Sequence, residues 1–284
     1  MTVQEATYYL LNQLRTAFGE TEASQMTDWI MEYITGSKKT ERMLYKNAVM
    51  TEKEATQIKE FTLRILGQEP LQYVLNESWF CGLKFYVDRN VLIPRPETEE
   101  LVEWIISNCK FPVDELKILD IGCGSGCIPI TLKRRIRKAE VWSCDISGSA
   151  LAVAGKNAAS LGTEVNFVEM DFLDKDSWKV LPSFDIIVSN PPYVPEKDKS
   201  SMSPNILANE PATALFVPDN DPLVFYKAMA EFGKDHLSAT GSIYAELHEE
   251  LGEATSRLFQ GAGYITELKK DMQQKDRMIK AVDR

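Results

Sequence analysis

Residues 118–126 read Ile-Leu-Asp-Ile-Gly-Cys-Gly-Ser-Gly, and this stretch decides the fold of the larger part of the chain. The apolar run from Lys117 to Ile121 is short and ends at glycine, which predicts a buried strand. Three alternating glycines then allow a tight turn, and the apolar residues that follow predict a helix through Leu132. A strand that passes through a glycine turn into a helix is the beginning of a parallel α/β unit.

The chain repeats this alternation of strand and helix from Pro96 onward. Helices are predicted at Glu97–Ser107 and, capped by Ser147, up to Leu161; further strands are predicted at Val141–Cys144, Val165–Val168, Phe184–Ser189 and Ser242–Glu246. Tyr264–Leu268 and Met278–Val282 are expected to pair as a terminal antiparallel hairpin. The order predicts an α/β fold with a doubly wound, largely parallel, Rossmann-like sheet.

The first 75 residues have a different pattern and predict a small helical domain. Thr2 with Glu5, and Thr51 with Glu54, have the spacing of capping boxes at helix starts. Gly67 and Pro70 end the helical pattern, and apolar residues then alternate around Gly82 as in a β-hairpin. We therefore expect a helical domain at 1–75, a linking hairpin at 76–95 and the α/β domain at 96–284.

Composition excludes several classes of protein. The chain has 284 residues, 44% of them apolar, and its 32 basic and 42 acidic residues give a net charge of −10. No stretch approaches the roughly 20 apolar residues of a membrane span, and the N-terminus lacks the pattern of a signal peptide, so a cytoplasmic location is expected. Five cysteines in scattered contexts fit reduced thiols. The acidic balance disfavours a protein that mainly grips nucleic-acid phosphates.

The glycine turn and two later acidic residues together predict a nucleoside site. Residues Gly122, Cys123, Gly124, Ser125 and Gly126 form the turn, where glycines let backbone N–H groups approach a polar ligand. Asp145 ends the next strand, where a carboxylate can bind ribose hydroxyls. Asp171 and Phe172 follow the third strand, where a carboxylate can bind an adenine amino group and an aromatic ring can cover the base.

Ser189-Asn190-Pro191-Pro192-Tyr193 follows the fourth strand and carries the second chemical signal. The two prolines stiffen the loop and remove two backbone donors. The Asn190 side-chain carbonyl and the Pro191 backbone carbonyl can each accept one hydrogen of a substrate NH2 group, and Tyr193 offers a flat face beside it. Such a site suits a planar amide or an aromatic amine, which it would hold in a fixed orientation.

Other candidate residues are less specific. Arg95 is predicted either to shape a substrate groove or to form an ion pair with Glu97 or Glu99. Glu246 is expected to have a structural or supporting role. Neither His236 nor His248 has a second ligand at metal spacing, and Cys123 and Cys127 lack a flanking pair, so no metal site is expected.

Four motifs together resemble the release factor glutamine methyltransferases of the PrmC/HemK type, which are class I S-adenosylmethionine-dependent methyltransferases. They are Leu-Ile-Pro-Arg-Pro-Glu-Thr-Glu at 92–99, Ile-Leu-Asp-Ile-Gly-Cys-Gly-Ser-Gly at 118–126, Val-Ser-Asn-Pro-Pro-Tyr at 188–193 and Asn-Glu-Pro-Ala-Thr-Ala-Leu at 209–215. Pro-Leu-Gln-Tyr at 70–73 and Phe80-x-Gly82 extend the resemblance to the N-terminal region. The chain departs from the family pattern at Asn76, where glycine is expected, and at 273–277, where a glycine-containing turn is usual.

The resemblance implies methylation of the side-chain amide nitrogen (N5) of the glutamine in the Gly-Gly-Gln motif of peptide chain release factors. It implies S-adenosyl-L-methionine as cofactor, held by residues 122–126, Asp145, Asp171, Phe172 and Asn190. Residues 190–193, with Arg95, would then bind the glutamine and its surroundings. The N-terminal domain would dock the release factor, and a monomer that needs neither membrane nor nucleic acid is expected.

Two other substrates and one non-enzymatic role stay open from the residues alone. The same loop would serve glutamine in a ribosomal protein, or the N6 amino group of adenine in nucleic acid. An adenine enzyme needs a basic region to hold the nucleic-acid backbone, and this acidic chain has only a compact helical addition. A binding module without activity is disfavoured because the glycine turn and Asn190 are both intact.

Overall fold

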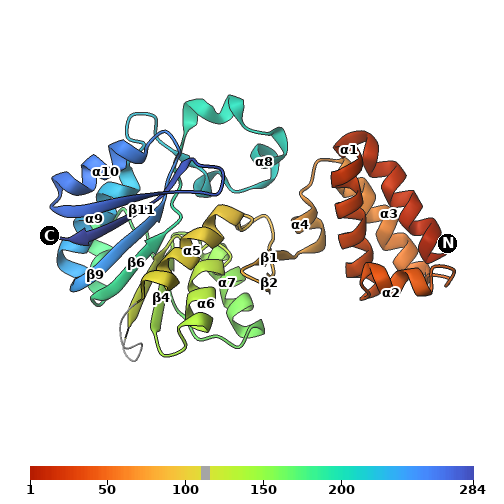
Figure 1. Ribbon diagram of the computed structural model, residues 1–284, viewed down its shortest axis with the longest axis horizontal. Helices are drawn as coiled ribbons and strands as arrows, with labels where there is room; N and C mark the ends of the chain where they lie inside the picture. Colours follow the sequence, from red (N-terminus) through yellow and green to blue (C-terminus); the bar gives the residue numbers. More distant parts are fainter. Residues whose placement is uncertain (110–115) are drawn as a thin grey trace. The chain divides into compact units, whose positions relative to one another are not determined.

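The computed structural model describes residues 1–109 and 116–284, and these divide into two compact units. The first unit is Met1–Glu77 and the second is Ser78–Arg284 (Figure 1). Among the helices of the described residues, none is long and apolar enough to cross a membrane.

The first unit is helical, as the sequence predicts. Its helices are α1 (Val3–Thr35), α2 (Lys39–Leu44), α3 (Glu52–Leu66) and α4 (Leu71–Leu75). Both predicted capping boxes are present, at the starts of α1 and α3. Gly19, with φ +77°, interrupts the helical geometry inside α1. Apolar side chains at helical spacing, such as Leu10 and Leu14 on α1 and Ile58 and Ile65 on α3, form a fully buried core.

The predicted hairpin is present but shorter than expected. Strands β1 (Ser78–Phe80) and β2 (Leu83–Phe85) pair antiparallel around Cys81 and Gly82, both of which have positive φ. Val87 and Val91, within the predicted 76–95 hairpin, lie beyond β2. Phe80 and Phe85 are buried in the core of the second unit, so the hairpin folds as part of that unit. Its role as a link between domains stays a prediction.

The second unit is built on a seven-stranded sheet in the order β10-β11-β9-β6-β3-β4-β5. Its strands are β3 (Lys117–Ile121), β4 (Glu140–Asp145), β5 (Asn166–Glu169), β6 (Phe184–Ser189), β9 (Leu237–Glu246), β10 (Tyr264–Lys270) and β11 (Asp276–Asp283). Neighbours from β9 to β5 are parallel, while β11 is antiparallel to both β9 and β10. The predicted doubly wound, largely parallel sheet and the terminal antiparallel hairpin are confirmed.

Helices cover both faces of the sheet (Figure 1). The helices are α5 (Pro96–Asn108), α6 (Cys127–Arg135), α7 (Gly148–Ser160), α8 (Pro204–Asn209), α9 (Val224–His236) and α10 (Gly252–Gly261). Strands β7 (Val194–Pro195) and β8 (Phe216–Val217) form a small separate pair. The loop Asn190–Tyr193, which contains both prolines, joins β6 to β7.

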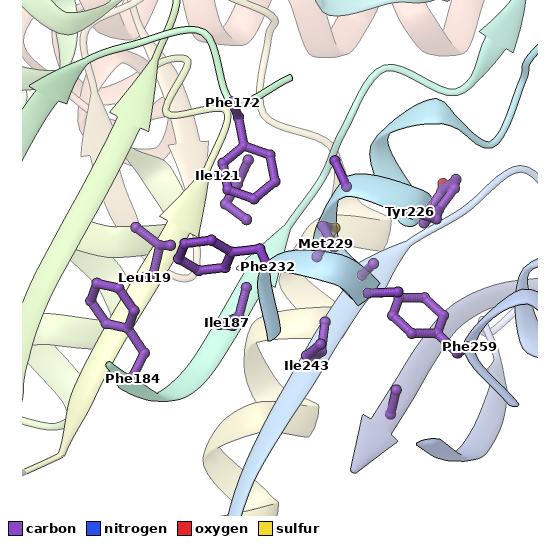
Figure 2. Close-up of a cluster of buried hydrophobic side chains, with 14 of the residues drawn as sticks. Leu119, Ile121, Phe172, Phe184, Ile187, Tyr226, Met229, Phe232, Ile243 and Phe259 are labelled. Atoms are coloured by element: carbon purple, nitrogen blue, oxygen red, sulfur yellow. The ribbon is translucent and has the colours of Figure 1, made fainter. Parts of the chain in front are cut away.

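Side chains of the central strands alternate between two cores. Ile118 lies in the core under α5 and α6, whereas Leu119 lies in the core under α9 and α10. Figure 2 shows the second core, in which Phe232 of α9 lies near Phe172 and Phe184. Because both faces of the central strands are buried, these strands are largely apolar, which is why their positions could be predicted.

Both departures from the family pattern lie at left-handed backbone positions. Asn76, the residue after α4, has φ +51°, and Gln274, in the turn between β10 and β11, has φ +66°. Glycine is the usual residue at such positions because other side chains are strained there. Asparagine tolerates this conformation better than glutamine does, so the strain is greater at Gln274.

Candidate functional site

The carboxyl ends of β3, β4 and β6 meet at one edge of the sheet, and the predicted site residues follow them. The Ser189 hydroxyl at the end of β6 donates to the backbone oxygen of Ile121 at the end of β3 (2.7 Å). The glycine turn and the loop that begins with Asn190 therefore start from adjacent strands. A topological switch point of this kind is where α/β sheets place their ligands.

All three glycines of the turn have the left-handed backbone that glycine favours: φ is +83° at Gly122, +53° at Gly124 and +78° at Gly126. Gly122 and Gly124 line a cavity, and a Cβ at either would meet no atom within 4 Å. At Gly126, by contrast, a Cβ would lie 2.9 Å from Ile130 Cδ1 and 3.1 Å from Ala154 Cβ. Gly126 therefore permits close packing of α6 on α7 and does not line the cavity.

The backbone N–H groups of the turn bind inside the protein. Gly122 and Cys123 donate to the backbone oxygen of Cys144, and Gly126 donates to that of Cys123. Gly124 donates to Asp145 Oδ2 (2.9 Å). The sequence led us to expect these N–H groups to approach a ligand, and that expectation is corrected for these four, because their hydrogen atoms already hold the turn in shape.

Asp145 lines the cavity and also holds two chain segments in place. Its Oδ2 accepts from Gly124, and its Oδ1 accepts from the backbone N–H of Ser147 at the start of α7 (2.9 Å). Each carboxylate oxygen has two lone pairs, so each keeps one acceptor position beyond these bonds. The sequence predicted a ligand contact for Asp145 but not this bracing of the turn.

The cavity wall beyond Asp145 is largely apolar. Phe172 lines it from the core, where it is 5% exposed and its ring lies 5.3 Å from that of Phe232. Ile146 and Leu173 also line it, and they are 60% and 38% exposed. These two side chains were not predicted, although each directly follows a predicted site residue. Asp171 lines the same wall and accepts from the Leu173 N–H.

Asn190, Pro191 and Pro192 line the same cavity as the glycine turn. The Asn190 amide nitrogen, Nδ2, donates to Thr98 Oγ1 (3.0 Å). Tyr193 does not line the cavity; its ring packs 6.2 Å from that of His248 and its hydroxyl donates to Glu246 Oε1 (3.0 Å). The flat face that Tyr193 offers to a substrate amide therefore stays a prediction.

A buried carboxylate, Glu246 at the end of β9, accepts hydrogen bonds from both Thr98 and Tyr193. It is 1% exposed, and its Oε2 accepts from the Thr98 hydroxyl (2.7 Å) while its Oε1 accepts from Tyr193. Burial raises the pKa of Glu246, and the hydrogen bonds from Thr98 and Tyr193 and the charge of Arg277 oppose that rise. Burial likewise raises the pKa of Tyr193, so its phenol keeps its proton at neutral pH.

Arg95 lines the cavity and pairs with an acidic residue that the sequence did not indicate. Its Nη2 lies 2.6 Å from Glu210 Oε1, in place of the predicted pairing with Glu97 or Glu99. The other oxygen of Glu210 accepts from the backbone N–H of Ile93 (3.3 Å). The Glu210 side chain is 2% exposed and therefore needs a cationic partner, whereas Glu99 accepts from the N–H of Cys81.

The turn contains the buried Cys123 and is followed by the partly buried Cys127. Burial is the main cause that raises the pKa of Cys127, to about 12, and it raises that of Cys123 as well, so both stay protonated at neutral pH. Among the described residues, no three His, Cys, Asp or Glu side chains are grouped in a way that could hold a metal ion. Asp120, under the turn, is fully buried, and mainly for that reason its pKa is raised to about 8.

The cavity has a volume of about 390 Å³, within the range of small-molecule sites. Its lining includes the glycine turn, Asp145 and the apolar wall together with Asn190–Pro192 and Arg95. Open space at two glycines, carboxylates with free lone pairs and exposed apolar side chains together suit a nucleoside. The chain therefore brings a nucleoside-type pocket and an amide-accepting loop into one cavity.

Comparison with known proteins gives consistent matches along the chain. Residues 98–216 match the methyltransferase small domain and residues 9–75 match the PrmC N-terminal domain. The release factor glutamine methyltransferase of Flavobacterium psychrophilum is 41% identical over 99% of each chain. That of Bacteroides thetaiotaomicron is 37% identical over 97% of this chain and 98% of its own. A solved release-factor-specific protein-(glutamine-N5) methyltransferase from Alicyclobacillus acidocaldarius superposes with a TM-score of 0.44 at 23% identity, covering 70% of this chain and 100% of its own.

Proposed function

The chain belongs to the release factor glutamine methyltransferases, and from this premise we propose how its residues carry out the reaction. It is an S-adenosylmethionine-dependent protein-(glutamine-N5) methyltransferase, whose substrate is the glutamine of the Gly-Gly-Gln motif in peptide chain release factors. One observation carries the assignment of roles. The glycine turn and the Asn190–Pro192 loop line a single cavity, so donor and acceptor sites are continuous.

The glycine turn, Asp145 and the apolar wall of the cavity fit S-adenosylmethionine. Gly122 and Gly124 leave room where any side chain would protrude, and Asp145 keeps lone pairs for ribose hydroxyls. Ile146, Phe172 and Leu173 offer apolar surface for the adenine ring. When bound, S-adenosylmethionine supplies a methyl group activated by its positively charged sulfur.

Asn190 and Pro191, in the lining of the same cavity, bind and orient the substrate amide. The Asn190 carbonyl oxygen, Oδ1, and the Pro191 backbone oxygen each accept one hydrogen of the glutamine NH2 group. An amide nitrogen is a poor nucleophile because its lone pair is delocalised, so orientation is the main contribution of these acceptors. They also strengthen as positive charge develops on the nitrogen, which lowers the barrier. The excess proton leaves to water after methyl transfer, and no strong base is required.

The remaining parts of the proposal concern the whole protein. The first unit, Met1–Glu77, docks the release factor, and the second unit carries the reaction. The protein works as a monomer in the cytoplasm. The relatives' names support a release factor as substrate and give no support to methylation of a ribosomal protein or of adenine.

Replacing Asn190 by alanine tests the assigned chemistry. We expect kcat for a purified release factor to fall by about 10²–10³, the range seen when one stabilising hydrogen-bond partner is lost. Binding of S-adenosylmethionine, measured by calorimetry, is expected to persist. Asn166→Ala, at the edge strand β5, is the matched control and should methylate like wild type. Wild-type turnover by the Asn190 variant would refute the role of Asn190. If wild-type protein given labelled S-adenosylmethionine transferred the label only to nucleic acid, the release factor would be refuted as the substrate.

A further inference from the structure

A relay of two hydrogen bonds connects Glu246, Thr98 and Asn190, which belong to three separate segments of the fold. Glu246 ends β9, Thr98 lies in the first turn of α5, and Asn190 directly follows β6. The two bonds measure 2.7 Å and 3.0 Å. Thr98 is 2% exposed and Glu246 is 1% exposed, so water does not compete for these bonds.

The chemistry of the three groups determines which group donates and which accepts in each bond of this relay. An ionised carboxylate only accepts hydrogen bonds, so the single hydroxyl proton of Thr98 is committed to Glu246. The Thr98 oxygen then has only lone pairs to offer Asn190, which must turn its NH2 group toward it. The carbonyl Oδ1 of Asn190 accepts no hydrogen bond from the described part of the chain, and the residue lines the cavity.

We propose that Thr98 and Glu246 are positioning residues that fix the orientation of the Asn190 amide group, so that its oxygen is offered to the substrate NH2 group. This proposal rests on the proposed function and deepens it. The two orientations of an asparagine amide are nearly equal in shape, so packing alone selects poorly between them. If the amide turned over, its NH2 group would meet the substrate NH2 group, and two donors repel each other.

The groups around Glu246 act on its ionisation in both directions. Burial and the charge of Glu97 on α5 disfavour the ionised form, whereas the charge of Arg277 on β11 favours it. The Tyr193 hydroxyl donates to the second carboxylate oxygen, and the Tyr226 hydroxyl donates to the backbone oxygen of Glu246. Both carboxylate oxygens thus accept a hydrogen bond, and the bonds from Thr98 and Tyr193 favour the ionised, accepting form.

Paired substitutions at Thr98 test the proposal. Thr98→Val keeps the shape and removes the hydroxyl, and kcat for a release factor is expected to fall at least about tenfold, since a hydrogen bond to a charged group is lost from the relay. The dissociation constant of S-adenosylmethionine is expected to stay within about twofold, because Asp145 and the glycine turn are untouched. Thr98→Ser keeps the hydroxyl and is expected to return kcat to within about threefold of wild type.

A second position shows whether the effect passes through the relay. Glu246→Gln gives the carboxylate position an NH2 group that can donate to Thr98, so kcat is expected to fall. Combined with Thr98→Val, the same change is expected to cost much less, because the hydroxyl that transmits it is already gone. The control is Thr255→Val on α10, a fully buried threonine whose hydroxyl has no hydrogen-bond partner among the described residues. It should methylate like wild type.

The outcomes separate the relay from the proposed function. Wild-type kcat in Thr98→Val, an equal loss in Thr98→Ser and Thr98→Val, or fully additive losses at the two positions would each overturn the relay. If Thr98→Val does not fold, as judged by its thermal melt, the kcat values of Thr98→Ser and Glu246→Gln decide. The relay then requires that Thr98→Ser keeps kcat and that Glu246→Gln lowers it. A wild-type protein that binds S-adenosylmethionine but leaves the release factor unmethylated would instead overturn the proposed function.

Discussion

Replacing Gly126 by alanine tests whether the third glycine of the turn serves packing of the helices. A Cβ at this position would lie 2.9 Å from Ile130 Cδ1 and 3.1 Å from Ala154 Cβ. The Ala154 backbone, 3.3 Å away, cannot retreat without moving α7. The substitution therefore combines overpacking with backbone strain at φ +78°.

The expected loss of stability follows from these two contributions. Left-handed strain costs a non-glycine residue about 1–2 kcal/mol, and overpacking of a well-packed core costs about 1–3 kcal/mol. Alanine recovers about 0.5–1 kcal/mol because its unfolded chain is less flexible than that of glycine. The net loss is about 3 kcal/mol, which lowers the melting temperature of a unit of this size by about 6–12 °C.

Tryptophan fluorescence during thermal unfolding gives a suitable assay. Trp79, Trp104, Trp142 and Trp178 lie in the second unit and only Trp29 lies in the first, so the signal reports mainly on the unit that contains Gly126.

Two other glycines supply matched controls. Gly124→Ala has strain at φ +53° but no atom within 4 Å, so it should lose only about 1 kcal/mol while weakening S-adenosylmethionine binding. Gly155→Ala, inside α7 and in open space, should gain up to about 1 kcal/mol. If Gly126→Ala melted within about 2 °C of Gly124→Ala, the packing argument would be refuted.

Two further predictions concern stability. The pKa of Asp120 is raised to about 8, chiefly by burial, so the neutral form is favoured in the folded state and its contribution to stability is full below about pH 4 and lost as pH rises to about 8. The free energy of unfolding in urea should be measured for wild type and Asp120→Asn across this pH range. Relative to the variant, the wild type should lose at most about 1.4 kcal/mol of stability per pH unit. If the free energies of the two proteins changed with pH in parallel, the raised pKa of Asp120 would be contradicted. Gln274→Gly should relieve the strain at φ +66° and raise stability by about 0.5–1 kcal/mol, as measured by thermal melting, whereas Gln273→Gly next to it, without positive φ, should lower it.

Elements with a local signal could be predicted from the sequence. Strands β3 and β6 have the predicted bounds because apolar residues on both faces make each a largely apolar segment that ends at a glycine or a polar residue. Strand β9 was predicted to begin at Ser242 but begins at Leu237. Its extra residues are held by pairing of Leu237 with Phe184 across a register shift, which is a long-range contact without a local pattern.

The candidate site likewise has residues with a local sequence signal and residues that are brought together only by long-range contacts. The glycine turn and the Asn190 loop are contiguous motifs, so their residues could be named in advance. Glu210 could not be assigned to Arg95, because the two residues are 115 positions apart and either nearby acidic residue offered an equally good partner. Pairing was decided by burial: Glu210 is enclosed, and a buried carboxylate binds the cation that reaches it.

The least predictable residues are those that act on another side chain. Thr98 lies 92 positions from Asn190 and 148 positions from Glu246 in the sequence. Separations of this length produce no recognisable pattern in residue spacing or composition. Only the parallel order of β6 and β9, with α5 packed beside them, brings these three together. A motif therefore identifies which group meets the substrate, while the sheet order determines which distant groups orient it. For this site the orientation of one amide depends on a carboxylate that ends a different strand.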